Sequence, residues 1–100
     1  MWFAGAHADI GGSYKPDVDG CVLSNNSLEW MISQAEDAGL TIEEHLKDRL
    51  KPSPMAKIHN SWRSFYRIKT KHFRPIEHGI IHESVKLRWD QDSTYRPKNI

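Results

Sequence analysis

The chain has 100 residues, enough for one small domain and no more. Hydrophobic residues make up 38% of it, which predicts a thin core, but four tryptophans, three tyrosines and three phenylalanines argue against a disordered chain. The single cysteine, Cys21, excludes an internal disulfide and a multi-cysteine zinc site. Because no apolar run approaches the roughly 18 residues of a membrane span and the N-terminus lacks a signal peptide's basic start, we expect a cytoplasmic protein.

The charges are unevenly distributed although the net charge is only +1. Residues 1–50 hold three Lys or Arg against nine Asp or Glu, whereas residues 51–100 hold eleven against four. Such polarity is typical either of an anion-binding half or of two halves that attract each other. For a chain of this size we favour mutual attraction within one domain.

The first segment, residues 1–14, is predicted to be a strand followed by a loop that carries a histidine. Residues 2–6 are short, apolar and bounded by glycine, which suits the end of a buried strand better than a helix. Gly11 and Gly12 then free the backbone for a tight bend. Residues 15–26 are rich in turn formers and predict a surface loop.

A helix is predicted after this loop. Asn26 with Glu29 three residues later resembles a capping box, and Ser24 or Ser27 are alternative caps. Apolar residues follow at helical spacing, and Gly39 has the position of a C-terminal cap.

A second helix completes a predicted helical pair over residues 26–51. Thr41 and Glu44 match the Thr-x-x-Glu signature of a helix start, and Pro52 and Pro54 end the helical region.

The remaining part, residues 58–100, is aromatic and basic. Residues 58–68 fit either a helix with its aromatic side chains on one side or an irregular aromatic clamp. Residues 72–76 are predicted to be extended because the residue before a proline avoids the helical region. Residues 82–89 can form one last short helix with Val85 and Trp89 facing inward.

His7 is the sharpest candidate for chemistry. It stands where a short apolar run breaks into glycine, which is how several hydrolases present a general base at the end of a strand. From spacing alone, a histidine that only hydrogen-bonds its own loop is the simpler interpretation.

Four stretches together resemble one known family. They are the element Trp-Phe-x-Gly-x-His-x-Asp-x-Gly-Gly over residues 2–12, which is the most specific, the helix-like residues 28–40, and the closing residues 81–85 and 95–99. The chain is similar to the C-terminal part of an uncharacterised α/β-hydrolase-like domain family related to the catalytic domain of type VI secretion phospholipase effectors. The resemblance implies an incomplete α/β-hydrolase-like fold, with one core strand and a histidine loop followed by a mainly α-helical C-terminal part.

The resemblance also implies a catalytic role for His7. In α/β-hydrolases the triad follows the chain order serine, acid, histidine, so a fragment holding the end of that order carries the histidine alone. By resemblance His7 corresponds to the triad histidine, which acts as general base. Asp9 is a candidate catalytic residue beside it, although fixing the loop is its more direct role.

Two departures from the family pattern matter. Members often have a third glycine where this chain has Ser13, and no Gly-x-Ser-x-Gly elbow occurs in the sequence. The expected function is therefore that of a truncated serine-hydrolase-like domain of phospholipase or esterase type, inactive alone. A companion chain that supplied the missing sheet would allow action on an ester or lipid.

Other functions find weaker support in the sequence. His78 and His82 have the spacing of helical metal ligands, but a third ligand is not evident, so we expect neither a metal nor a cofactor. The alternative function is a non-catalytic module that binds anionic lipid or, less favoured, nucleic acid. A gene remnant without selected function also stays open. The residues of the basic and aromatic cluster that supports the binding module are Arg63, Phe65, Tyr66, Arg67, Lys69, Lys71, His72, Phe73 and Arg74.

Overall fold

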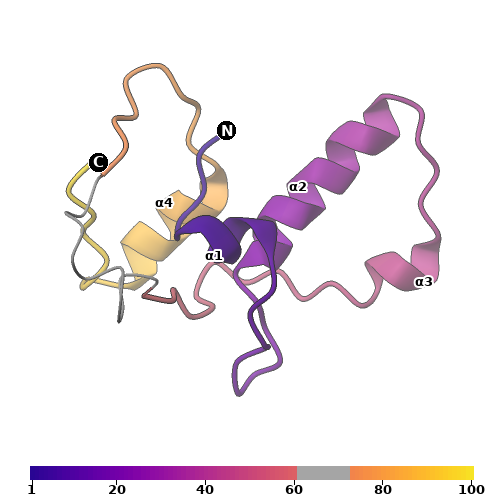
Figure 1. Ribbon diagram of the computed structural model, residues 1–100, viewed down its shortest axis with the longest axis horizontal. Coiled ribbons are helices and arrows are strands. Elements are labelled where there is room, and N and C mark those ends of the chain that lie inside the picture. Colours follow the sequence, from indigo (N-terminus) through magenta and orange to yellow (C-terminus); the bar gives the residue numbers. More distant parts are fainter. Residues whose placement is uncertain (61–72) are drawn as a thin grey trace.

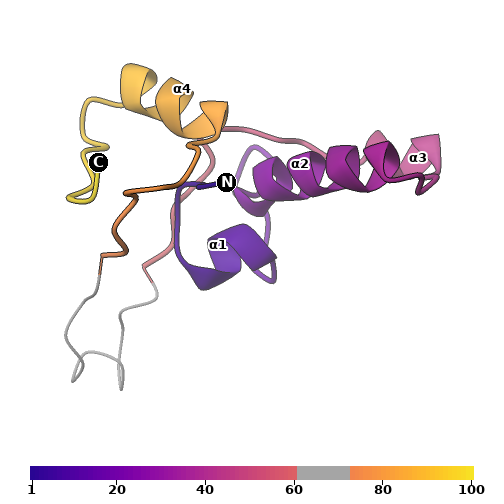
Figure 2. The same cartoon turned by 90° about the horizontal axis from the view of Figure 1, so that it is seen from above.

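The structure is a computed structural model that describes residues 1–60 and 73–100. These residues form four helices, α1 (His7–Gly11), α2 (Ser24–Asp37), α3 (Glu44–Lys47) and α4 (Glu83–Gln91). Helix α1 packs against α2, and α3 and α4 lie at opposite ends of the molecule (Figure 1, Figure 2). None of these helices, in the part of the chain that the structure describes, has the length and apolar character needed to cross a bilayer.

The predicted core strand at residues 2–6 is wrong, and with it the α/β fold class. The described residues contain no strand, only an isolated parallel bridge between Trp2 and Ile81. The bridge does not extend into a strand: on one side α4 begins at Glu83, two residues after Ile81, and on the other Gly5, at a φ of 108°, turns the chain toward α1. Ala6 then caps α1, so that His7 is the first residue of a helix and not part of a loop.

Helix α2 confirms the first predicted helix, with a different start. It begins at Ser24 with Leu23 as the N-cap residue, and Gly39 follows its end at a φ of 101°. The Asn26 side chain does not cap the helix. Its Nδ2 donates to the carbonyl oxygens of Leu23 at 2.9 Å and Ser53 at 2.8 Å. Asn26 therefore joins α2 to a distant part of the chain.

The second predicted helix is much shorter than expected. Helix α3 is a single turn that begins after Glu43, so Thr41 does not start it. Lys47 Nζ lies 2.7 Å from Glu36 Oε2, which connects α3 to α2. The hydrogen bond to Glu36 raises the pKa of Lys47 above its ordinary value.

Helix α4 confirms the predicted last helix. His82 caps it, because its Nδ1 accepts a hydrogen bond from the Ser84 backbone N–H at 3.2 Å. Val85 on this helix is buried as expected. Most of the predicted helix or clamp at residues 58–68 falls within residues 61–72, outside the described residues.

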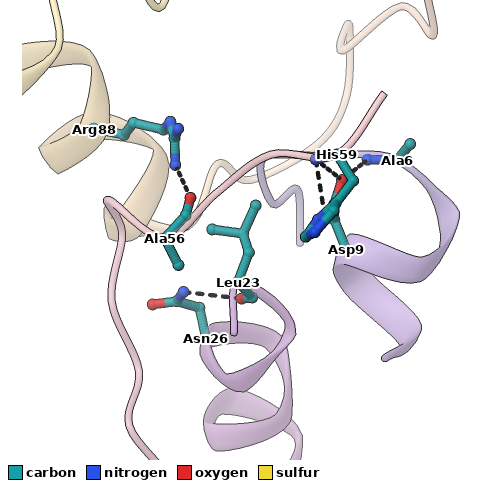
Figure 3. Close-up of polar contacts among 7 residues, drawn as sticks. All are labelled: Ala6, Asp9, Leu23, Asn26, Ala56, His59 and Arg88. Atoms are coloured by element: carbon teal, nitrogen blue, oxygen red, sulfur yellow. Dashed lines mark hydrogen bonds and ion pairs between the residues drawn. The ribbon is translucent and has the colours of Figure 1, made fainter. Parts of the chain in front are cut away.

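Polar contacts of one segment, residues 53–60, connect three helices. This central segment accepts from Asn26 of α2 through the Ser53 carbonyl oxygen. Arg88 of α4 donates to the carbonyl oxygens of Pro54 at 2.9 Å and Ala56 at 2.6 Å. Its far end contacts α1, as Figure 3 shows. The buried hydrophobic residues of the described chain are few, namely Ala4, Leu23, Ala56 and Val85. We therefore expect these polar contacts to contribute an unusually large share of the folding stability.

Ser13 occupies a backbone conformation that favours glycine, with a φ of 98°. A side chain in this region costs of order 1–2 kcal/mol, and glycine's greater freedom in the unfolded chain offsets part of the gain from removing it. We expect Ser13→Gly to raise the free energy of unfolding by about 1 kcal/mol, measured by denaturant titration.

Ser33→Gly is the matched control for this substitution. Ser33 is exposed within α2, where glycine is a poor helix former, so this variant should lose roughly 0.5 kcal/mol. Equal destabilisation by both substitutions would contradict strain at Ser13.

Candidate active site

His7 lies on the surface as the first residue of α1. Its side chain is exposed and lines a cavity of about 650 Å³. Asp9, two residues further, does not contact His7 in the described structure; its carboxylate contacts lie elsewhere. In the described structure the Asp9 carboxylate therefore does not orient the His7 imidazole, although the two residues are close in the sequence.

Asp9 is the most buried charged residue of the described chain, with 1% of its side chain exposed. One carboxylate oxygen, Oδ2, accepts from the backbone N–H of Ala6 at 3.2 Å, which satisfies a free donor at the start of α1. This placement of the Asp9 side chain requires glycine at residue 5, because a Cβ there would collide with the Cβ of Asp9. Asp9 thus fixes the start of a helix, whereas the sequence predicted that it fixes a loop.

The same carboxylate also holds His59 of the central segment. The Nδ1 of His59 lies 2.8 Å from Asp9 Oδ1, and the His59 backbone N–H donates to both carboxylate oxygens at 3.3 and 3.2 Å (Figure 3). The Tyr14 ring stacks on the imidazole, with centroids 3.8 Å apart and an angle of 13° between the planes. His59 is therefore fixed by its backbone, by a ring nitrogen and by its ring face.

Sequence reasoning missed His59. It lies fifty residues from Asp9 in an irregular segment, and no local spacing signal connects the two. The sequence holds six histidines, and nothing in the residues around His59 distinguishes it from the other five.

The cavity beside these residues is mainly apolar. Arg74 is the cationic side chain of its described wall, and His7 and His59 are its imidazoles. Burial raises the pKa of Tyr95, which also lines it, above its usual value, partly opposed by the nearby Arg88 guanidinium. The other lining residues are Trp2, Phe3, Ala4, Gly5, Ala6, Ile10, Ile58, Phe73, Ile76, Ile81, Val85, Pro97, Asn99 and Ile100.

The other candidate sites do not assemble in the described structure. His82 caps α4 through Nδ1, whereas His78 is exposed, and no three His, Cys, Asp or Glu side chains of the described ranges gather as metal ligands would. Of the basic and aromatic cluster, only Phe73 and Arg74 belong to the described residues.

Comparison with known proteins relates the first third of the chain to a hydrolase family. Residues 1–34 match the family model of the type VI secretion system phospholipase effector Tle1-like catalytic domain. The family resemblance drawn from the sequence is thus confirmed over these residues, which include His7, Asp9 and most of α2. Comparisons with curated proteins and with solved structures found no match.

Proposed function

We propose that this chain contributes the proton-transferring histidine, His7, to ester hydrolysis of the serine-hydrolase type, with a phospholipid as substrate. The observation that carries the proposal is the position of His7, within the matched family segment and on the wall of the 650 Å³ cavity. An exposed imidazole can take the proton of an attacking hydroxyl and return it to the leaving alcohol.

The lining of the cavity supports an acyl ester with an anionic headgroup. Its aromatic and aliphatic walls suit an acyl chain, because burying apolar surface favours binding by about 25 cal/mol per Å². Arg74 supplies a cation for a phosphate, since a guanidinium pairs with two phosphate oxygens at once.

The serine nucleophile is proposed to come from outside these 100 residues, since they contain no Gly-x-Ser-x-Gly elbow. His7 would act on it once the two parts are joined, so the chain by itself is proposed to lack the covalent route. Action in the cytoplasm, expected from the sequence, stays a prediction.

Binding of an uncleavable substrate analogue tests the proposal. We expect a short-chain diether phosphatidylglycerol, which has no carboxylic ester bond, to shift the NMR signals of the His7 ring and the Trp2 indole saturably. The signals of His45, exposed on α3, should not move. Arg74→Gln should weaken binding about fivefold, as expected for a loss of ~1 kcal/mol from an exposed charge pair.

Two results would contradict the proposal. Saturable binding that shifts Trp2 but leaves His7 unmoved would remove His7 from the substrate site. Turnover of a p-nitrophenyl ester that His7→Ala abolishes in the 100-residue chain would place the nucleophile within it.

A further inference from the structure

We propose that Asp9 and His59 form a carboxylate–imidazole dyad in which His59 is a second proton-transferring group of the cavity, able to activate a water molecule against an ester. The inference rests on the proposed function for the class of substrate. The inference differs from the proposed function in the proton-transferring residue, which is His59 here and His7 there.

The contact with Asp9 selects the tautomer of a neutral His59 ring. An ionised carboxylate only accepts hydrogen bonds, so the 2.8 Å contact to Asp9 Oδ1 places the ring proton on Nδ1. The lone pair of the neutral imidazole is then on Nε2. A base oriented by a buried acid through its other nitrogen is the arrangement by which triads prepare a histidine.

The ring is held rigidly where it can meet a substrate. Asp9 also binds the His59 backbone N–H, and Tyr14 stacks on the ring, so the imidazole is constrained at three points. The His59 side chain is 18% exposed and lines the cavity, whereas the Asp9 side chain is 1% exposed. The imidazole can therefore reach a ligand while its carboxylate partner is shielded from competing water.

His7 has no comparable support in the described structure. It is exposed, and the carboxylate nearest to it along the chain is engaged with His59. The physical difference between the two histidines is orientation: the fold sets the tautomer and plane of one ring and leaves those of the other to solvent.

The proposed step balances without an added reagent other than water. Nε2 of His59 takes a proton from water as the water oxygen forms a bond to the acyl carbon. The ester C–O bond then breaks, its electron pair leaves with the alcohol oxygen, and that oxygen takes the proton back from the imidazolium. The negative charge of an ionised Asp9 carboxylate would balance the positive charge of the imidazolium.

Hydrolysis of p-nitrophenyl butyrate by the 100-residue chain tests the step. Attack by water needs no serine nucleophile, so the inference predicts turnover where the sequence alone predicted an inactive chain. After subtraction of the buffer rate, we expect His59→Gln to lower kcat/KM on the order of 100-fold, the lower end of what a general base contributes. Glutamine keeps a side-chain donor for Asp9, so the fold should persist, which the dispersion of the amide NMR spectrum checks. His45→Gln, at an exposed position on α3, is the matched control and should keep the wild-type rate.

Asp9→Asn tests the positioning role separately. Its amide can donate to Nδ1, which would move the ring proton of His59 to Nε2 and remove the base, as the wrong tautomer does in triads. We expect a lower kcat with little change in KM, together with the corresponding change in the ¹⁵N NMR signals of the His59 ring. A purely structural role for Asp9 would not shift kcat and tautomer together.

Three results would overturn the inference: a wild-type ring protonated on Nε2, a His59→Gln variant with the wild-type rate, or no rate above buffer in the wild-type chain. The first can be read without any variant. Failure of the proposed function is distinguishable, because its test reads the His7 ring signal on binding of the diether lipid and does not depend on this rate.

Discussion

Asp9→Ala is expected to lower the free energy of unfolding by about 3 kcal/mol. The substitution removes the acceptor of the backbone N–H groups of Ala6 and His59 and of the His59 ring nitrogen. Each buried donor left without a partner costs roughly 1–3 kcal/mol, and water entering the space recovers part of this. Because small domains have only about 5–15 kcal/mol of stability in total, the loss should be visible as a large shift of the urea midpoint.

The control for this prediction is Asp19→Ala. Asp19 is an exposed carboxylate in the loop before α2, so its removal should change stability by less than about 0.5 kcal/mol. The stability of Asp9→Asn should lie between those of Asp9→Ala and Asp19→Ala, because asparagine keeps the shape of the side chain and one acceptor oxygen. Equal midpoints for Asp9→Ala and Asp19→Ala would show that the contacts of Asp9 do not stabilise the fold.

Arg88→Met is expected to have a comparable effect, a loss of about 2–3 kcal/mol. The Arg88 side chain is buried, and its Nη1 donates to the carbonyl oxygens of Pro54 and Ala56. Its guanidinium also lies over the Tyr95 ring, 5.4 Å from the centroid. Methionine fills much of the same volume, so the loss reports the hydrogen bonds and the cation–π contact more than the packing.

Lys86→Met on the same helix separates this effect from a change in helix propensity. Lys86 is exposed on α4, and both substitutions exchange a cation for the same apolar residue. We expect the control to stay within about 0.5 kcal/mol of the wild type. If both variants unfold at the same urea concentration, the link between α4 and the central segment contributes nothing.

These two effects are large for the same reason. The buried hydrophobic residues are few, and the central segment, residues 53–60, has no helix or strand of its own to hold it. Asp9 at one end and Arg88 near the other fix this segment to α1 and α4. The Asp9 contact is also an ion pair between the acidic and the basic half of the chain when His59 is protonated.

Helix α2 and helix α4 could be predicted from sequence because their signals are local. Apolar spacing places both, and Gly39 marks where α2 ends. The start of α2 was less accurate, since Asn26 and Ser27 form tertiary contacts and not caps: Ser27 Oγ donates to the Ile10 carbonyl oxygen at 2.6 Å. A hydrogen bond from a side chain to a residue distant in the sequence cannot be predicted from the local pattern of residues.

The strand at residues 2–6 was wrong because an apolar run predicts burial better than it predicts the structure that buries it. A strand requires a ladder of hydrogen bonds to a neighbour, and in the described residues the bridge from Trp2 to Ile81 does not continue. Local backbone geometry at Gly5 and the contact of Asp9 with Ala6 favour a helix start instead.

The sequence by itself determined the two longer helices, the thin core and the family resemblance of the histidine-bearing element, because composition, periodicity and motif spacing are properties of neighbouring residues. Only the tertiary structure decided the partner of Asp9. His59 is brought to it across fifty positions of chain by an irregular segment, and the directions in which such a segment points depend on contacts that sequence spacing does not record.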